Sequence, residues 1–110
     1  MEEQLHNKFK KIVNESTKYC VFEHEYSING GVGDFILKHI KKKRLLVVEV
    51  KYIDNYSEGK TARVRRNKNR NKVVHQAWRY GKAVKEKYKN YEVVVCIFTN
   101  EYGLYKLGVL

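Results

Sequence analysis

Two carboxylates and a lysine stand where the sequence predicts β-strands, and together they could bind a metal ion. Glu49 and Lys51 interrupt the apolar, β-branched run 45–53. Alternate residues of a strand share a face, so these two side chains are expected on the same side, with Leu45 and Val47. Asp34 lies on the preceding predicted strand and would come alongside across a hairpin. Isolated charges in a buried strand are costly, so the cluster needs a counter-ion or a function.

The donor types favour a hard divalent cation. Two carboxylates and a main-chain carbonyl are oxygen ligands, and no histidine or cysteine joins them, which favours Mg²⁺ over zinc and allows Mn²⁺ to substitute. The four histidines show no zinc-binding spacing. Cys20 and Cys96 are expected to be two reduced thiols in the core. The alternative for Asp34, Glu49 and Lys51 is a structural ion network without a catalytic role.

The elements that would position these residues form a single domain over residues 1–110. Leu5, Phe9, Ile12 and Val13 have the spacing of an amphipathic helix, predicted over 2–18. A second helix is predicted from 73 to about 89, and strands are predicted over 19–27, 33–40, 45–53, 93–98 and 104–109. This order, αβββαββ, predicts an α/β fold (an α+β mixed sheet) with a right-handed parallel crossover through the second helix.

Charge and composition limit the class of partner. The chain carries 23 Lys and Arg against 12 Asp and Glu, a net charge of +11, and its 43% hydrophobic content suffices for one core. A field of this sign favours DNA or RNA. A membrane surface is less favoured because there is no basic amphipathic helix and no long apolar segment. The acidic start, Met1-Glu2-Glu3-Gln4, leads us to expect an intracellular protein that is not secreted.

The acidic residues also resemble a known signature. Gly33-Asp34, followed fifteen residues later by Glu49-Val50-Lys51, resembles the PD-(D/E)XK motif of the restriction-endonuclease-like nuclease superfamily, with Gly33 in place of its loosely kept proline. The predicted element order is similar to that superfamily's core over nearly the whole chain. Gln76-Ala77-Trp78-Arg79-Tyr80 resembles the QxxxY motif of its exonuclease and RecB-like branch. Taken alone, that segment is better explained as an ordinary amphipathic helix whose tyrosine packs and whose glutamine is solvated, whereas together with Asp34 and Glu49-Val50-Lys51 it favours the motif.

The resemblance implies a role for each residue of the site. Asp34, Glu49 and the Val50 carbonyl would hold Mg²⁺, and Lys51 would position or deprotonate the attacking water or stabilise the pentavalent phosphorus.

The helices would complete the site. Gln76 would orient Lys51 or the scissile strand, with support from Tyr80. An acidic or histidine residue is also implied on the first helix. By helical angle Glu2 falls within the arc of the buried stripe and Glu3 outside it, so Glu2 is the expected residue and Glu3 the alternative.

The activity implied is that of a magnesium-dependent deoxyribonuclease. The small size resembles virus-type replication-repair (VRR-NUC) nucleases and archaeal Holliday-junction resolvases, which implies a homodimer acting on branched DNA in repair, recombination or replication. The QxxxY resemblance points instead to an exonuclease or end-processing enzyme. A non-catalytic, basic nucleic-acid-binding protein is a third interpretation.

A basic segment lies between the predicted catalytic strand and the second helix. Residues 54–72 lack periodicity and are predicted to form a charged loop. We expect its cations to contact DNA phosphates without reading bases, the alternative being a solvated segment without a partner. The expected DNA-binding residues are Lys60, Arg63, Arg65, Arg66, Lys68, Arg70 and Lys72.

Overall fold

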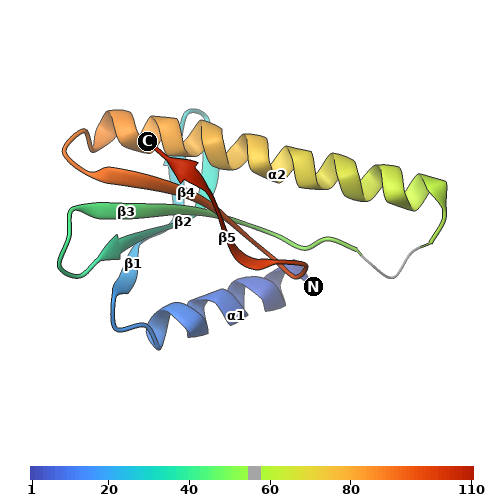
Figure 1. Ribbon diagram of the computed structural model, residues 1–110, viewed down its shortest axis with the longest axis horizontal. Coiled ribbons are helices and arrows are strands. Elements are labelled where there is room, and N and C mark those ends of the chain that lie inside the picture. The colour runs from blue at the N-terminus through green and yellow to red at the C-terminus, as the bar shows by residue number, and fades with distance from the viewer. Residues whose placement is uncertain (55–57) are drawn as a thin grey trace.

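The computed structural model describes residues 1–54 and 58–110 and places one five-stranded sheet between two helices (Figure 1). The elements, in chain order, are α1 (Glu2–Asn14), β1 (Tyr19–Ile28), β2 (Gly31–His39), β3 (Arg44–Lys51), α2 (Lys60–Lys87), β4 (Glu92–Thr99) and β5 (Gly103–Val109). The strands lie in the order β1-β2-β3-β4-β5, and only the β3–β4 pair is parallel. The predicted element order, mixed sheet and parallel crossover are confirmed, and the finer likeness to a restriction-endonuclease core stays a prediction.

The sheet has an apolar core on each face because its central strands are apolar on both sides. On the α1 face, Phe9 packs between Phe35 and Phe98, with ring centroids 4.9 Å away in each case. On the α2 face, Tyr80 and Val84 join a cluster that includes residues of β1 to β4. The spacing of Leu5, Phe9 and Val13 in α1 directs all three side chains into the first core.

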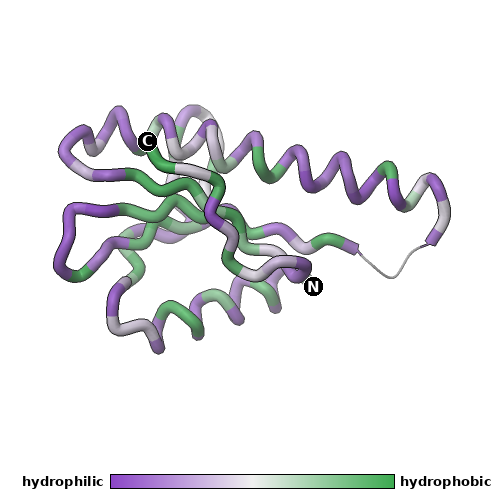
Figure 2. Tube along the Cα trace, viewed as in Figure 1, coloured by the Kyte–Doolittle hydropathy of each residue, from purple (hydrophilic) through white to green (hydrophobic). Residues whose placement is uncertain are grey.

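Helix α2 is longer than the sequence pattern predicts. It starts at Lys60 and contains 28 residues, so the prediction of a charged loop over residues 54–72 is wrong from Lys60 onward. Residues 55–57 of that prediction lie outside the described part. Arg, Lys and Ala favour helix. Apolar periodicity is missing because the N-terminal half of α2 extends past the sheet, and Ala62 is buried there alone among residues 60–72. Figure 2 shows this half as mostly hydrophilic.

Local contacts move several other boundaries. α1 ends at Asn14 rather than at residue 18, and Ser16 Oγ accepts hydrogen bonds from the N–H groups of Lys18 and Tyr19 as the chain turns into β1.

Cys96 is buried as expected, but Cys20 is exposed because β1 is an edge strand, so the prediction of two core thiols is wrong for Cys20. Among the described residues, neither helix is both long and apolar enough to cross a membrane.

Candidate active site

Asp34 and Glu49 lie where β2 and β3 separate. The paired register of these strands stops at Phe35 and Val48, one residue before the two carboxylates. The Asp34 N–H donates to Glu49 Oε2 at 2.8 Å, and the Val50 N–H donates to Asp34 Oδ2 at 2.8 Å. Each strand's carboxylate therefore binds the main chain of the other strand, and the predicted meeting of these two residues is confirmed.

Burial raises the pKa of both carboxyl groups. Burial is the main cause, and repulsion by Asp34 adds to it, so that the pKa of Glu49 rises to about 8. Glu49 is only 4% exposed. Burial also raises the pKa of Asp34, against the opposing effect of the Val50 N–H bond. Like charges in a desolvated position are costly, and a bound cation would remove that cost.

The direction of the Val50 carbonyl follows from the hydrogen bond that the same residue donates. In a strand, the N–H and C=O of one residue point toward the same neighbouring strand. The Val50 N–H points toward β2, where it meets Asp34, so the Val50 carbonyl is directed to that side as well. The two carboxylates at the end of the β2–β3 ladder and this carbonyl are the three oxygen donors that the resemblance implies, and their joint binding of a metal ion stays a prediction.

Lys51 and Glu2 form a second pair beside the carboxylates. Lys51 Nζ lies 3.8 Å from Glu2 Oε2 on α1, while the described residues show no ion pair between Lys51 and Asp34 or Glu49. The sequence places Lys51 on the face of Leu45 and Val47, but those two pack in the cluster beneath α2. Lys51 is the last residue of β3, and its ammonium group reaches α1 on the other side of the sheet from that cluster, so the shared face stays a prediction. Glu2 is brought to the site, and Glu3 has no ion pair within the described ranges.

His6 is a site residue that the sequence interpretation missed. Its Nε2 lies 4.0 Å from Asp34 Oδ1, and its ring lies 5.8 Å from that of Phe35. His24 of β1 lies beside it, with its ring centroid 6.4 Å from that of His6 and stacked at 4.4 Å on that of Phe35. The available signal was the spacing of Glu2 and His6, which are four residues apart and hence share one face of α1.

The two residues of the QxxxY resemblance have different surroundings. Tyr80 is buried, and a Cβ added to Gly31 would lie 2.4 Å from the Tyr80 hydroxyl oxygen. Tyr80 is therefore fixed against β2, which is the strand that carries Asp34. Gln76 is partly exposed and makes no hydrogen bond within the described part of the chain. The predicted link between Gln76 and Lys51 remains a prediction.

Gly33, which stands in place of the family's proline, has a packing role. A Cβ at Gly33 would lie 2.2 Å from Cζ of Tyr26, so this close approach of the ring needs a residue without a side chain. Gly31 and Gly33 are alternate residues of β2 and accept Tyr80 and Tyr26, respectively. This departure from the resembling motif is thus explained by a tyrosine that covers the strand next to Asp34.

The seven cations of the basic segment differ in their availability. Arg70 is bound by Glu101 through both Nε, at 2.7 Å, and Nη2. Arg66 Nη1 donates to the Asp54 carbonyl at 3.4 Å. These two contacts fasten α2 to neighbouring loops. The remaining cations are exposed and lie along the part of α2 that extends past the sheet: Lys60, Arg63, Arg65, Lys68 and Lys72.

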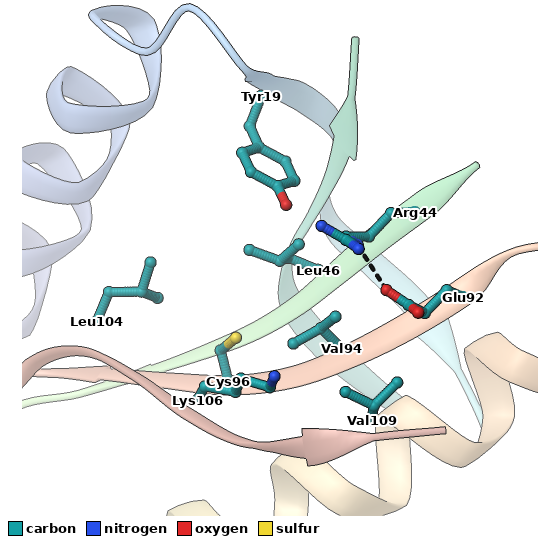
Figure 3. A pocket seen from close by; sticks show the side chains of 9 residues that line it. All are labelled: Tyr19, Arg44, Leu46, Glu92, Val94, Cys96, Leu104, Lys106 and Val109. Atoms are coloured by element: carbon teal, nitrogen blue, oxygen red, sulfur yellow. Dashed lines mark hydrogen bonds and ion pairs between the residues drawn. The ribbon is translucent and has the colours of Figure 1, made fainter. Parts of the chain in front are cut away.

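A separate groove of about 400 Å³ lies at the other end of β3 (Figure 3). Its floor includes Leu46, Val94 and Cys96, and its rim carries the ion pair of Arg44 and Glu92, whose Nε–Oε1 distance is 2.5 Å. Opposite charges are already paired there. The acidic side chain of the groove therefore has a cationic partner, unlike the carboxylates of Asp34 and Glu49, for which the described residues show no ion pair to lysine or arginine.

Comparison with protein-family models, curated proteins and solved structures gives no match. Among the described residues, no group of three or more histidine, cysteine, aspartate and glutamate side chains has the arrangement of a metal site. Any metal ion at this position would therefore depend on two carboxylates, main-chain oxygen and water.

Proposed function

We propose that this protein is a metal-dependent nuclease that hydrolyses phosphodiester bonds in DNA. One observation carries the proposal: Asp34 and Glu49 are held together at a strand end, largely buried, with no cation within ion-pair distance of Glu49 among the described residues. Such a pair is unfavourable when both groups are ionised. A divalent cation would stabilise it and supply a reason for its position.

The available donors fit Mg²⁺ or Mn²⁺ better than zinc. All three are oxygen atoms, from Asp34, Glu49 and Val50, and Mg²⁺ commonly binds one or two carboxylates while keeping several waters. When bound, the metal would polarise a phosphate oxygen and lower the pKa of a coordinated water. The small number of protein ligands suits that chemistry, because open positions are needed for water and substrate.

The neighbouring side chains would position the substrate and the water. Lys51, held by Glu2, would place its ammonium group beside the scissile phosphate, where it can stabilise developing negative charge. His6, whose Nε2 lies near Asp34, would donate a proton to the reacting groups or accept one from them. Tyr80 supports the strand that carries Asp34, and Gln76 would contact Lys51 or the scissile strand.

Exposed cations of α2 would attract and align the DNA backbone. Lys60, Arg63, Arg65, Lys68 and Lys72 offer side chains for phosphate contacts, whereas Arg66 and Arg70 already have protein partners. Phosphate contacts orient a duplex without reading its sequence. The small domain leads us to propose a structure-selective endonuclease acting on branched DNA as a homodimer, which brings two sites to one junction.

The second candidate is a non-catalytic DNA-binding protein. The observation that favours it is that both carboxylates already accept main-chain hydrogen bonds, so they could serve only to continue the β2–β3 ladder. In that case the basic helix would be the functional element. The two candidates differ in whether Asp34 and Glu49 bind a catalytic metal ion or only hold the two strands together.

The test is cleavage of a substrate panel with Mg²⁺ or Mn²⁺. Linear duplex, single-stranded and four-way-junction DNA are incubated with the wild-type protein and with Glu49→Gln, Lys51→Ala and the control Glu92→Gln. We expect metal-dependent cleavage that either site variant reduces by roughly two to three decades, as for other preorganised charge-stabilising groups, while DNA binding persists. Uncut DNA with the wild-type protein, or equal cleavage by Glu49→Gln, would support the binding protein instead.

A further inference from the structure

The hydroxyl of Tyr26 is buried without a hydrogen-bond partner among the described residues. Tyr26 lies on β1 opposite Gly33 and is 7% exposed. Buried hydroxyl groups in folded proteins are nearly always hydrogen-bonded to protein or to ordered water. Phenylalanine would fill the same apolar space without an unsatisfied polar atom, so packing does not explain the presence of this hydroxyl.

The position of the hydroxyl relates it to the proposed site. A Cβ at Gly33 would lie 2.4 Å from the Tyr26 oxygen, so the hydroxyl lies directly above the residue that precedes Asp34. Burial is the main cause that raises the pKa of Tyr26, followed by the charges of Glu49 and Asp34 and by Tyr80. Both carboxylates thus act electrostatically on the Tyr26 hydroxyl, although it makes a hydrogen bond to neither of them.

The chemistry of these groups is complementary. Ionised carboxylates accept hydrogen bonds only, whereas a tyrosine hydroxyl donates one and accepts others. A water molecule between them can accept from the hydroxyl and donate to a carboxylate, and such a bridge is nearly as favourable in enthalpy as a direct bond. The site has several polar groups to hold a water in this position.

We propose that Tyr26 is a positioning residue whose hydroxyl donates a hydrogen bond to a water molecule held beside Asp34 and Glu49. This inference rests on the proposed nuclease function, in which the site must orient water toward a phosphodiester. Tyr26 would act through that water and would not touch the DNA. The close fit of its ring against Gly33 fixes the hydroxyl in place, which is what such a role requires.

The test compares wild type with Tyr26→Phe, which removes one oxygen and keeps the ring. Three quantities are measured: unfolding in urea, Mn²⁺ affinity by calorimetry, and kcat and KM on the cleaved DNA. We expect unchanged or greater stability, a fewfold weaker Mn²⁺ affinity, and a kcat lowered by about tenfold with unchanged KM, as for loss of one hydrogen bond. The matched control is Tyr88→Phe, a partly buried tyrosine that caps the C-terminus of α2 and packs against the same core cluster.

Each result has a defined meaning. If Tyr26→Phe binds Mn²⁺ and cleaves like the wild type, the inference is wrong and the proposed function stands. If Tyr26→Phe is clearly less stable, the hydroxyl has a structural partner in the free protein and the inference is also wrong. If the wild-type protein neither binds Mn²⁺ nor cleaves DNA, the proposed function fails, and the role of Tyr26 fails with it.

Discussion

The two ends of β3 carry charged groups of opposite design. At its start, Arg44 pairs with Glu92, an exposed contact between opposite charges. Near its other end, Glu49 meets Asp34, a buried contact between like charges. The first arrangement lowers electrostatic energy without help from a ligand. The second is favourable only when a proton or a cation reduces the repulsion, and this requirement is the reason for proposing a cation site at this end of the strand.

The largest expected effect is on stabilisation by Mn²⁺. A cation that binds only the folded protein stabilises it by about 2.7 kcal/mol at a concentration one hundred times its Kd. We expect Glu49→Gln to lose most of this stabilisation and Glu92→Gln to keep it. The measurement is thermal unfolding over a range of Mn²⁺ concentrations. Equal stabilisation of wild type and Glu49→Gln would place the cation elsewhere.

The next effect concerns the packing that supports the like-charged end. Gly33→Ala would force the added Cβ against the ring of Tyr26, so the free energy of unfolding should fall by about 1–3 kcal/mol, as is typical of overpacking. Val32→Ala is the matched control because Val32 is 57% exposed on the adjacent position. Urea unfolding measures both. A Gly33→Ala variant as stable as Val32→Ala would show that the ring moves freely.

The third prediction is a pH dependence that belongs to Glu49. Its folded pKa of about 8 exceeds its ordinary value of 4.5, so the folded state binds more protons than the unfolded state between these values. Stability should therefore fall as pH rises from about 5 to 8, by at most about 1.4 kcal/mol per pH unit, and should level off above the folded pKa. Urea unfolding in the absence of divalent ions should show this slope for wild type. Glu49→Gln should be flatter, and an equal slope would contradict the assignment.

A smaller effect should separate the cations of α2. Arg65→Gln combined with Lys72→Gln should lower the slope of log affinity for DNA against log salt by about two, because in the proposed function each side chain would contact one phosphate. Arg70→Gln should leave that slope unchanged, because Glu101 already binds Arg70, and should lower stability by about 1 kcal/mol or less. Binding measured at several salt concentrations checks both. A similar loss of slope for Arg70→Gln would contradict this division.

The smallest effect is expected at the oppositely charged end of β3. Arg44→Gln should change the free energy of unfolding only slightly, because exposed ion pairs contribute little. DNA cleavage should be unaffected. Urea unfolding and the cleavage assay with junction DNA test these statements. A large loss of cleavage in Arg44→Gln would extend the functional surface to the groove of Figure 3.

The strands and their order were predictable because their signals are local. The runs around Val47 and around Val95 are each apolar on both faces, which is typical of central strands covered by a helix on each side of the sheet. Asp34 and Glu49 stood out in the same way, as charges within such strands. The extent of α2 was not predictable from periodicity, since its first turns from Lys60 have no partner surface that would select apolar residues.

The pairing of charged groups could not be predicted at the same level. Lys51 is two residues from Glu49, yet it pairs with Glu2, 49 positions away in the sequence. Arg70 seemed equivalent to Lys72 as a DNA ligand until the turn after β4 placed Glu101 against it. His6 and Tyr26 carried no motif, and only their positions relative to Asp34 connect them with the site.

The sequence by itself determined the α+β mixed sheet, the positive field and the two carboxylates within buried strands. These follow from composition and from apolar spacing, which act over a few residues. The tertiary structure decided which charges are neutralised, which tyrosine covers Gly33, and that Asp34 and Glu49 bind each other's main chain. Those outcomes depend on strand register and helix placement, which bring together groups from 7 to 49 positions apart.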